Sequence, residues 1–312
     1  RDKLVTGVQT CALPISNLIT ALAPIKRGPI KLVLGPWTHG QRSVTSSGDV
    51  DFGADAVLDG QVGPDYFTLR RDWFDRHMLG RDAAPEHLPA PVRIFVMGGG
   101  SGRRTAEGRL DHGGRWRDEA AWPLPHARDV AMYLHGDGGL RSALPAADVA
   151  PLSYDFDPAD PVPTIGGAIT SGAPLMFAGG YDQRETEDLF GARHPGRALA
   201  ERPDVLVFET EPLAHDTEVT GSVVAALHIS SSAIDTDFTI KLVDVYPPNE
   251  DYPQGYALNL AHGILRARFR NSFEHPEPLE PDTVHVITIR AFPTSNLFRA
   301  GHRIRIEVSS SN

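Results

Sequence analysis

Apolar residues follow two different periods along the chain. In residues 65–79 they recur every three to four positions, which predicts an amphipathic helix with Asp65 as its N-cap and Gly80 as its stop. In residues 30–34 they are almost continuous and are followed by Gly35-Pro36, which predicts a short buried strand that ends in a turn.

Beyond residue 82 the pattern favours strands. Alternation is clearest in residues 237–246, where Phe238, Ile240 and Leu242 share one face. At least eight strands with Pro- and Gly-rich turns and almost no helical stretch predict an all-β sandwich of the jelly-roll type. The expected strands are residues 92–97, 130–135, 205–210, 220–231, 237–246, 256–270, 283–291 and 302–309.

Two Pro-rich segments divide this pattern. Residues 82–91 hold three prolines and are expected to be a linker, and residues 158–203 are expected to be a surface excursion that carries no elements. We therefore predict a short αβ region in residues 17–81 and a β-sandwich in residues 82–312. The αβ region is too small to bury a core alone.

The two ends of the chain suggest an internal fragment of a longer protein. Residues 1–16, RDKLVTGVQTCALPIS, fit neither the helix nor the strand period and resemble a translated sequencing-adapter read-through, so we expect them to be foreign to the fold. The half-buried strand 302–309 is followed by three residues only. A terminal strand without a partner is unfavourable, so we expect the sandwich to be truncated there.

Composition narrows the classes of function. The chain has 30 Lys and Arg against 40 Asp and Glu, a net charge of −10, so nucleic acid is not an expected partner. No apolar run is long enough to span a bilayer, and no membrane partner is expected. Cys11 is the only cysteine, which excludes an internal disulfide and a cysteine-based zinc site. No motif indicates a cofactor or a metal, and Asp235-Thr236-Asp237 is interpreted as a turn that starts a strand.

The strongest local feature is Gly35-Pro36-Trp37-Thr38-His39-Gly40. It places His39 in a loop directly after a buried strand, at the sheet edge where α/β folds gather their catalytic groups. A histidine there can serve as a general base near neutral pH.

The same stretch resembles the histidine motif of the CocE/NonD hydrolases, which include cocaine esterase, α-amino-acid ester hydrolases, glutaryl acylases and X-Pro dipeptidyl-peptidases. Further matches follow in the order of that family, from residue 17 to residue 312. They are YFTLRRDWFDRHMLG (66–80), PVRIFVMGGG (91–100), GRWRDEAAWPLP (114–125), RPDVLVFETEPL (202–213), DTDFTIKLVDVYP (235–247) and GILRARFR (263–270).

The resemblance implies the C-terminal end of an α/β-hydrolase domain followed by a jelly-roll sandwich. Residues 30–34 would be the last strand of the hydrolase sheet and residues 65–79 its final helix. His39 would be the base of a Ser-His-Asp triad that cleaves a small ester, an amide or an X-Pro peptide. The compartment and the oligomeric state stay open.

The chain departs from that family where the nucleophile should be. The triad order is serine, aspartate, histidine, yet Ser16 and Asp2 are the only serine and acid before His39, and no glycine elbow surrounds Ser16. We assign neither residue a role and expect no hydrolase activity from this chain alone. Ser101 in Gly99-Gly100-Ser101-Gly102 is interpreted as part of a turn, and Ser230-Ser231-Ser232 as a sheet edge.

A different class of function remains open from the residues. A β-sandwich can be a non-catalytic binding module for carbohydrate or a protein partner. Trp116 and Trp122 would then contact the ligand, although packing under a loop is the simpler interpretation of both. This alternative leaves the His39 loop unexplained.

Overall fold

The computed structural model describes residues 12–39, 41–82, 85–168 and 176–311. The helices are α1 (Ala12–Leu22) and α2 (Tyr66–Met78), with 3-10 turns η1 (Ala54–Ala56), η2 (Leu199–Glu201) and η3 (Ala267–Phe269). The strands are β1 (Leu32–Leu34), β2 (Ser46–Ser47), β3 (Val50–Asp51), β4 (Val92–Gly98), β5 (Leu110–Asp111), β6 (Gly114–Glu119), β7 (Tyr133–Leu134), β8 (Leu140–Arg141), β9 (Leu206–Glu209), β10 (Thr217–Ile229), β11 (Asp237–Tyr246), β12 (Tyr256–Arg266), β13 (His285–Phe298) and β14 (Arg303–Ser309).

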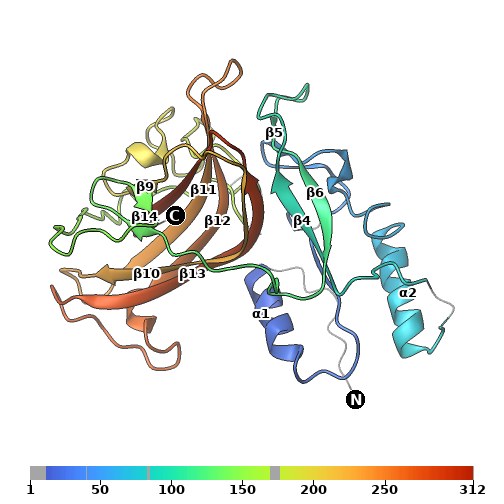
Figure 1. Ribbon diagram of the computed structural model, residues 1–312. Coiled ribbons are helices and arrows are strands. Elements are labelled where there is room, and N and C mark those ends of the chain that lie inside the picture. The colour runs from blue at the N-terminus through green and yellow to red at the C-terminus, as the bar shows by residue number, and fades with distance from the viewer. Residues whose placement is uncertain (1–11, 40, 83–84, 169–175, 312) are drawn as a thin grey trace.

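Two sheets form most of the molecule (Figure 1). One has the order β1-β4-β13-β10 with β6 paired to β4, and the other has the order β12-β11-β14-β9. Their facing sides share one apolar core, to which β11 contributes Phe238, Ile240 and Leu242 and β13 contributes Ile287 and Ile289. The predominance of β-structure after residue 82 is confirmed, and β11 has the predicted bounds.

The last strand in the sequence lies inside its sheet. β14 pairs antiparallel with β11 on one side and with β9 on the other. The expectation that this strand lacks a partner is therefore wrong, because its partners lie far upstream in the chain rather than after it.

The expectation that residues 158–203 form a surface excursion is also wrong. Val162, Ile165 and Leu199 from this segment are buried together with Val205. The segment covers the outer side of β11, where the buried Lys241 Nζ donates to Gln183 Oε1 at 2.9 Å. A buried ammonium needs such a partner, and the Pro- and Gly-rich composition of the segment conceals this role from a pattern analysis.

The N-terminal elements do not show the expected hydrolase sheet. β1 instead pairs parallel with β4, Leu32 opposite Val92, and so forms an edge of the first sandwich sheet. α1 begins at Ala12 and continues past the boundary expected at residue 16, because Ile15 and Ile19 give it an apolar face that packs near Leu34. Residues 1–11 lie outside the described residues.

Two further segments differ from their predictions. The strand expected at residues 130–135 is reduced to β7, paired with β8. The expected linker is held in place where it is described: His87 Nε2 lies 2.8 Å from Asp72 Oδ2, and Lys31 Nζ donates to the carbonyl oxygen of Leu88. α2 follows its pattern closely. Its N-cap Asp65 accepts a 2.9 Å hydrogen bond from the Thr68 amide.

Candidate active site

The loop after β1 carries His39 at the surface. β1 ends at Leu34, the chain turns through Gly35 and Pro36, and His39 lies exposed in a turn closed by the Gln41 amide on the Thr38 carbonyl oxygen at 3.2 Å. Gly40, the last residue of the motif, lies outside the described residues. The structure thus places the predicted base on an exposed loop at the carboxyl end of a strand.

Three contacts of Trp37 hold this loop in place. Its indole folds back over Gly35, where a Cβ would lie 2.5 Å from Cε3 of the ring, so only glycine fits. Its Nε1 donates to the carbonyl oxygen of Ala56 at 2.6 Å. Its ring packs on Trp116 of β6 with 5.5 Å between ring centroids.

A shallow hollow lies beside the loop. Its walls come from residues 41–44 and from the start of α2, and its volume is about 360 Å³. The Arg42 guanidinium lies 3.8 Å above the ring of Tyr66, and Phe67 at the rim is 79% exposed. An exposed histidine beside an aromatic, cationic hollow could accept a proton from a group placed above it.

Neither Ser16 nor Ser101 forms a nucleophile site in the described structure. Ser16, the only serine before His39, lies in α1 with its side chain buried, not at a strand-to-helix elbow. Ser101 donates its hydroxyl to Asp111 Oδ2 at 2.6 Å, so its proton is directed to a carboxylate rather than to a histidine. Asp2 lies outside the described residues.

A polar cluster lies buried where the turn between β5 and β6 meets β11 and β13. The Tyr246 hydroxyl bonds Nδ1 of His112, whose Nε2 lies 2.8 Å from Asn296 Oδ1. Asn296 donates to Asp244 Oδ2 at 3.1 Å, and Asp244 Oδ1 lies 2.8 Å from Nδ1 of His302. Because the chain of bonds joins the β5–β6 turn to three other segments, it fixes how this turn sits on β11, on β13 and on the residue before β14.

Burial governs the protonation of this cluster. It lowers the pKa of the His112 imidazole, so His112 is held neutral, and it raises the pKa of the Tyr246 hydroxyl well above its usual range. The buried Asp244 carboxylate is compensated by His302 and Asn296. The arrangement satisfies buried polar groups and leaves none poised as a nucleophile.

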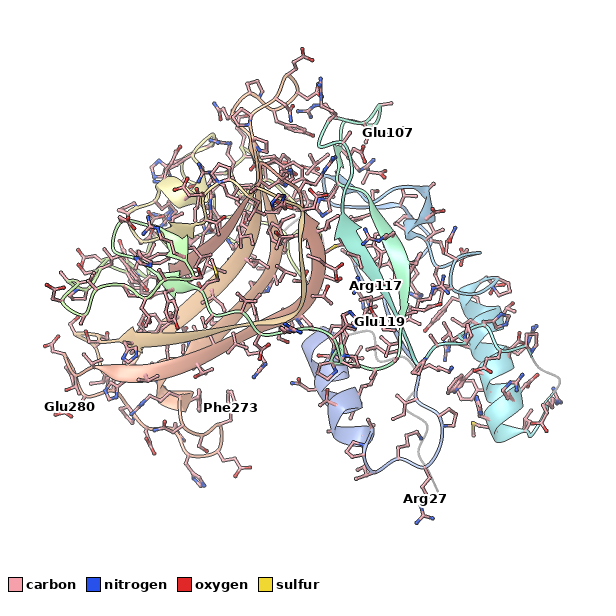
Figure 2. All side chains as sticks on the ribbon, in the orientation of Figure 1. Arg27, Glu107, Arg117, Glu119, Phe273 and Glu280 are labelled. Carbon is pink, nitrogen blue, oxygen red and sulfur yellow. The ribbon has the colours of Figure 1, made fainter. Side chains whose placement is uncertain are left out.

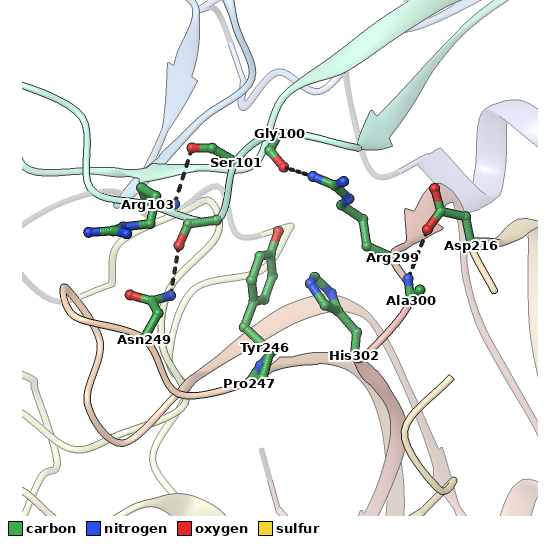
Figure 3. A pocket seen from close by; sticks show the side chains of 11 residues that line it. Gly100, Ser101, Arg103, Asp216, Tyr246, Pro247, Asn249, Arg299, Ala300 and His302 are labelled. Atoms are coloured by element: carbon green, nitrogen blue, oxygen red, sulfur yellow. Dashed lines mark hydrogen bonds between the residues drawn. The ribbon is translucent and has the colours of Figure 1, made fainter. Parts of the chain in front are cut away.

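A pocket of about 240 Å³ opens above this cluster (Figure 3). The rings of Tyr246 and His302 form its floor, 4.1 Å apart between centroids. Across its walls Arg299 donates to the Gly100 carbonyl oxygen at 2.9 Å, and Asn249 donates to that of Gly102 at 3.1 Å. These bonds hold residues 99–102, where a turn is predicted, against the sandwich.

A charged pair joins β6 to β10: Arg117 of β6 forms an ion pair with Glu218 of β10 at 2.7 Å. Arg117 also lies 2.5 Å from Glu119 of its own strand, and Figure 2 labels both residues on β6. Within the sandwich, Asp235 pairs with Arg268, and Asp237 pairs with Arg266. β11 begins at Asp237, so a strand starts at this segment as predicted.

The described part of the chain shows neither a metal centre nor a membrane span. No group of three or more His, Cys, Asp or Glu side chains in it could hold a metal ion. Among the same residues, no helix has the length and apolar character needed to cross a bilayer.

Sequence reasoning missed the buried cluster and the pair of tryptophans. The signal for the cluster was an acid inside an apolar strand: Asp244 interrupts the run Leu242–Tyr246 and is fully buried. The signal for the pair was weaker, because Trp37 and Trp116 lie far apart in the sequence and nothing local connects them.

Comparison with known proteins identifies relatives of this chain. Residues 87–312 match the family model of the X-Pro dipeptidyl-peptidase C-terminal non-catalytic domain. The chain is 36% identical over 304 residues to a cocaine esterase of Rhodococcus sp. (strain MB1 Bresler), a match that covers 95% of this chain and 46% of the esterase. The chain therefore spans less than half the length of that relative.

Two solved structures are similar over nearly the whole chain. An aminopeptidase from the marine sediment archaeon Thaumarchaeota archaeon superposes with a TM-score of 0.70 at 30% identity, over 94% of this chain and 44% of the aminopeptidase. An α-amino acid ester hydrolase superposes with a TM-score of 0.67 at 29% identity, over 90% of this chain and 42% of the hydrolase.

Proposed function

Because this chain belongs to the CocE/NonD hydrolase family and carries its X-Pro dipeptidyl-peptidase C-terminal non-catalytic domain, we propose that it is the C-terminal part of a serine hydrolase of carboxylic esters or amides. The single observation that carries the proposal is the exposed His39 on the loop after β1. It lies upstream of the non-catalytic domain, in a stretch that the 95% match to the esterase includes.

In this proposal His39 is the base of a Ser-His-Asp triad. It takes the proton of the serine hydroxyl as that oxygen attacks the substrate carbonyl, and returns the proton to the leaving group. The serine, the orienting aspartate and the oxyanion donors would come from a domain upstream of α1, of which β1 and α2 would be the last strand and helix. The sandwich would be a jelly-roll that supports the catalytic domain.

The test is the parent reading frame, recovered by long-read sequencing across the codon for Arg1. We expect a Gly-x-Ser-x-x-Gly elbow and an aspartate upstream of His39. The encoded protein should hydrolyse p-nitrophenyl acetate, and His39→Ala should lower kcat by roughly 10³-fold or more. A reading frame without a serine elbow, or an enzyme indifferent to His39→Ala, would overturn the proposal. His275→Ala, at an exposed loop of the sandwich, is the matched control and should leave kcat unchanged.

The chain by itself should not hydrolyse p-nitrophenyl acetate, because it lacks an assignable nucleophile. Hydrolysis by the purified chain that disappears in His39→Ala would contradict this. The alternative of a carbohydrate-binding module stays a prediction. The ring of Trp116, one of the two tryptophans that motivated this alternative, packs against the ring of Trp37.

A further inference from the structure

Two tryptophans from distant parts of the chain share one short turn. Trp37, two residues before His39, donates its Nε1 to the carbonyl oxygen of Ala56 at 2.6 Å. Trp116 of β6 donates its Nε1 to the neighbouring carbonyl oxygen of Asp55 at 2.7 Å. Their rings meet at 49°, so η1 and the two indoles form a single unit, here called the indole clamp (Trp37, Trp116 and η1).

Trp116 is the rigid member of the clamp. β6 is paired with β4 along its whole length, with Trp116 opposite Phe95, and the two rings pack edge-on at 5.2 Å. The guanidinium of Arg93, which is on β4, lies 5.8 Å from the centre of the Trp116 ring. A side chain held by a strand pair is located more firmly than one on a loop.

Trp37 belongs to the loop and depends on that support. The loop is anchored at its start by the three residue pairs between β1 and β4. Residues 35–39 belong to no strand, so the indole of Trp37 is the next fixed point before His39, and Trp116 forms one side of its site.

We propose that Trp116 is a positioning residue for His39. This rests on the proposed function, since it assumes that His39 is the base. Trp116 touches no reacting atom. It holds Trp37 in position, and Trp37 in turn holds the backbone that carries the imidazole of His39. A displacement of about 1 Å at a catalytic group can cost around 10²-fold in rate. The domain named non-catalytic would thus contribute to catalysis through one contact.

The first experiment needs no activity. Amide hydrogen exchange at Gln41, whose amide donates to the Thr38 carbonyl oxygen and closes the His39 turn, is measured in this chain and in Trp116→Ala. We expect exchange at this amide to rise by about tenfold or more, while exchange in β11 stays unchanged, since local opening differs from global unfolding. Trp73→Ala is the matched control, because Trp73 stacks on His77 of α2 instead. Unchanged loop exchange in Trp116→Ala would overturn the inference.

A second variant guards against misfolding. Trp116→Phe keeps a ring against Trp37 and loses only the hydrogen bond to Asp55. It should show exchange between that of the wild-type chain and that of Trp116→Ala. Loop exchange in Trp116→Phe equal to that of Trp116→Ala, with β11 protected in both, would show that the ring contact contributes nothing.

The second experiment uses the full-length enzyme from the parent reading frame. Trp116→Ala should lower kcat by roughly 10²-fold with KM nearly unchanged, and Trp116→Phe should restore much of kcat. A loss confined to KM would overturn the inference. The two proposals fail separately: activity that survives His39→Ala refutes the base, whereas lost activity in His39→Ala with full kcat in Trp116→Ala refutes only the positioning role.

Discussion

The sandwich and the His39-bearing region are held together in different ways. The sandwich core is built wholly from residues 134 onward, with Phe298, Ile240 and Ile287 almost completely buried. Every apolar cluster that includes residues of the N-terminal region also includes residues from beyond 87, as when Val50 and Phe52 pack with Phe95 and Tyr246.

The difference shows that the proposed base stands on a segment whose described residues form no core of their own. In this segment large apolar side chains are exposed on both helices and their loops, among them Ile25 at 74%, Phe67 at 79% and Leu79 at 62%. The order of its loop therefore depends on what it packs against. The segment carries the candidate chemistry and the sandwich supplies much of its support.

The largest expected effect comes from separating the two regions. A chain shortened to residues 87–312 loses Val50 and Phe52 from the cluster around Phe95, and the burial of two such side chains stabilises by roughly 3–6 kcal/mol. Its free energy of unfolding in urea should fall by at least about that amount, since Leu32, Leu58 and Val62 of the other shared clusters are lost as well. A chain beginning at residue 41 keeps both residues and should recover most of the loss. Equal urea midpoints for the two shortened chains would contradict the shared-core interpretation.

A cavity inside the sandwich should lower the free energy of unfolding by nearly as much. Phe298 is fully buried between the sheets, so Phe298→Ala should destabilise the protein by about 3–5 kcal/mol. Urea unfolding followed by tryptophan fluorescence measures this loss. Phe298→Leu, which leaves a smaller cavity, should lose clearly less, and equal losses for both variants would show that the site relaxes around either residue.

Acid should destabilise the protein through the buried His112 and the half-buried His262. Burial lowers the pKa of His112 and His262, so the unfolded chain, with its pKa near 6.5, binds protons that the folded chain refuses. Stability is therefore full above pH 6.5 and falls as the pH drops below it, by up to about 1.4 kcal/mol per pH unit for each histidine. Urea unfolding between pH 7.5 and 5.5 tests this. His262→Gln should roughly halve the slope, and a flat profile in the unsubstituted chain would refute the prediction.

The smallest effect is expected at the exposed face of α2. Phe67→Ala removes a ring that is 79% exposed and should change the free energy of unfolding by no more than about 0.5 kcal/mol. Thermal unfolding of this variant beside Phe298→Ala gives the contrast between the regions directly. A large loss in Phe67→Ala would mean that the N-terminal region has packing of its own.

Local pattern predicted the elements better than their partners. The alternation in residues 237–246 marked β11 at both ends, and Asp65 marked the start of α2, because period and capping are properties of neighbouring residues. The partner of β1 and the cover over Lys241 depend on segments many residues away, and no period encodes them. The same holds for the site: the turn with His39 is local, whereas the contact between Trp37 and Trp116 exists only after folding.

The position of β14 has a consequence for folding during synthesis on the ribosome. β9 takes its ladder from β14, with Glu209 bonded to Arg305 at a separation of 96 residues. At ribosomal rates of about 5–20 residues per second, synthesis of the residues between β9 and β14 takes roughly 5–20 s, and β9 lacks this partner strand during that time. During synthesis the sheet therefore has an unpaired edge, to which a chaperone or a second nascent chain could bind.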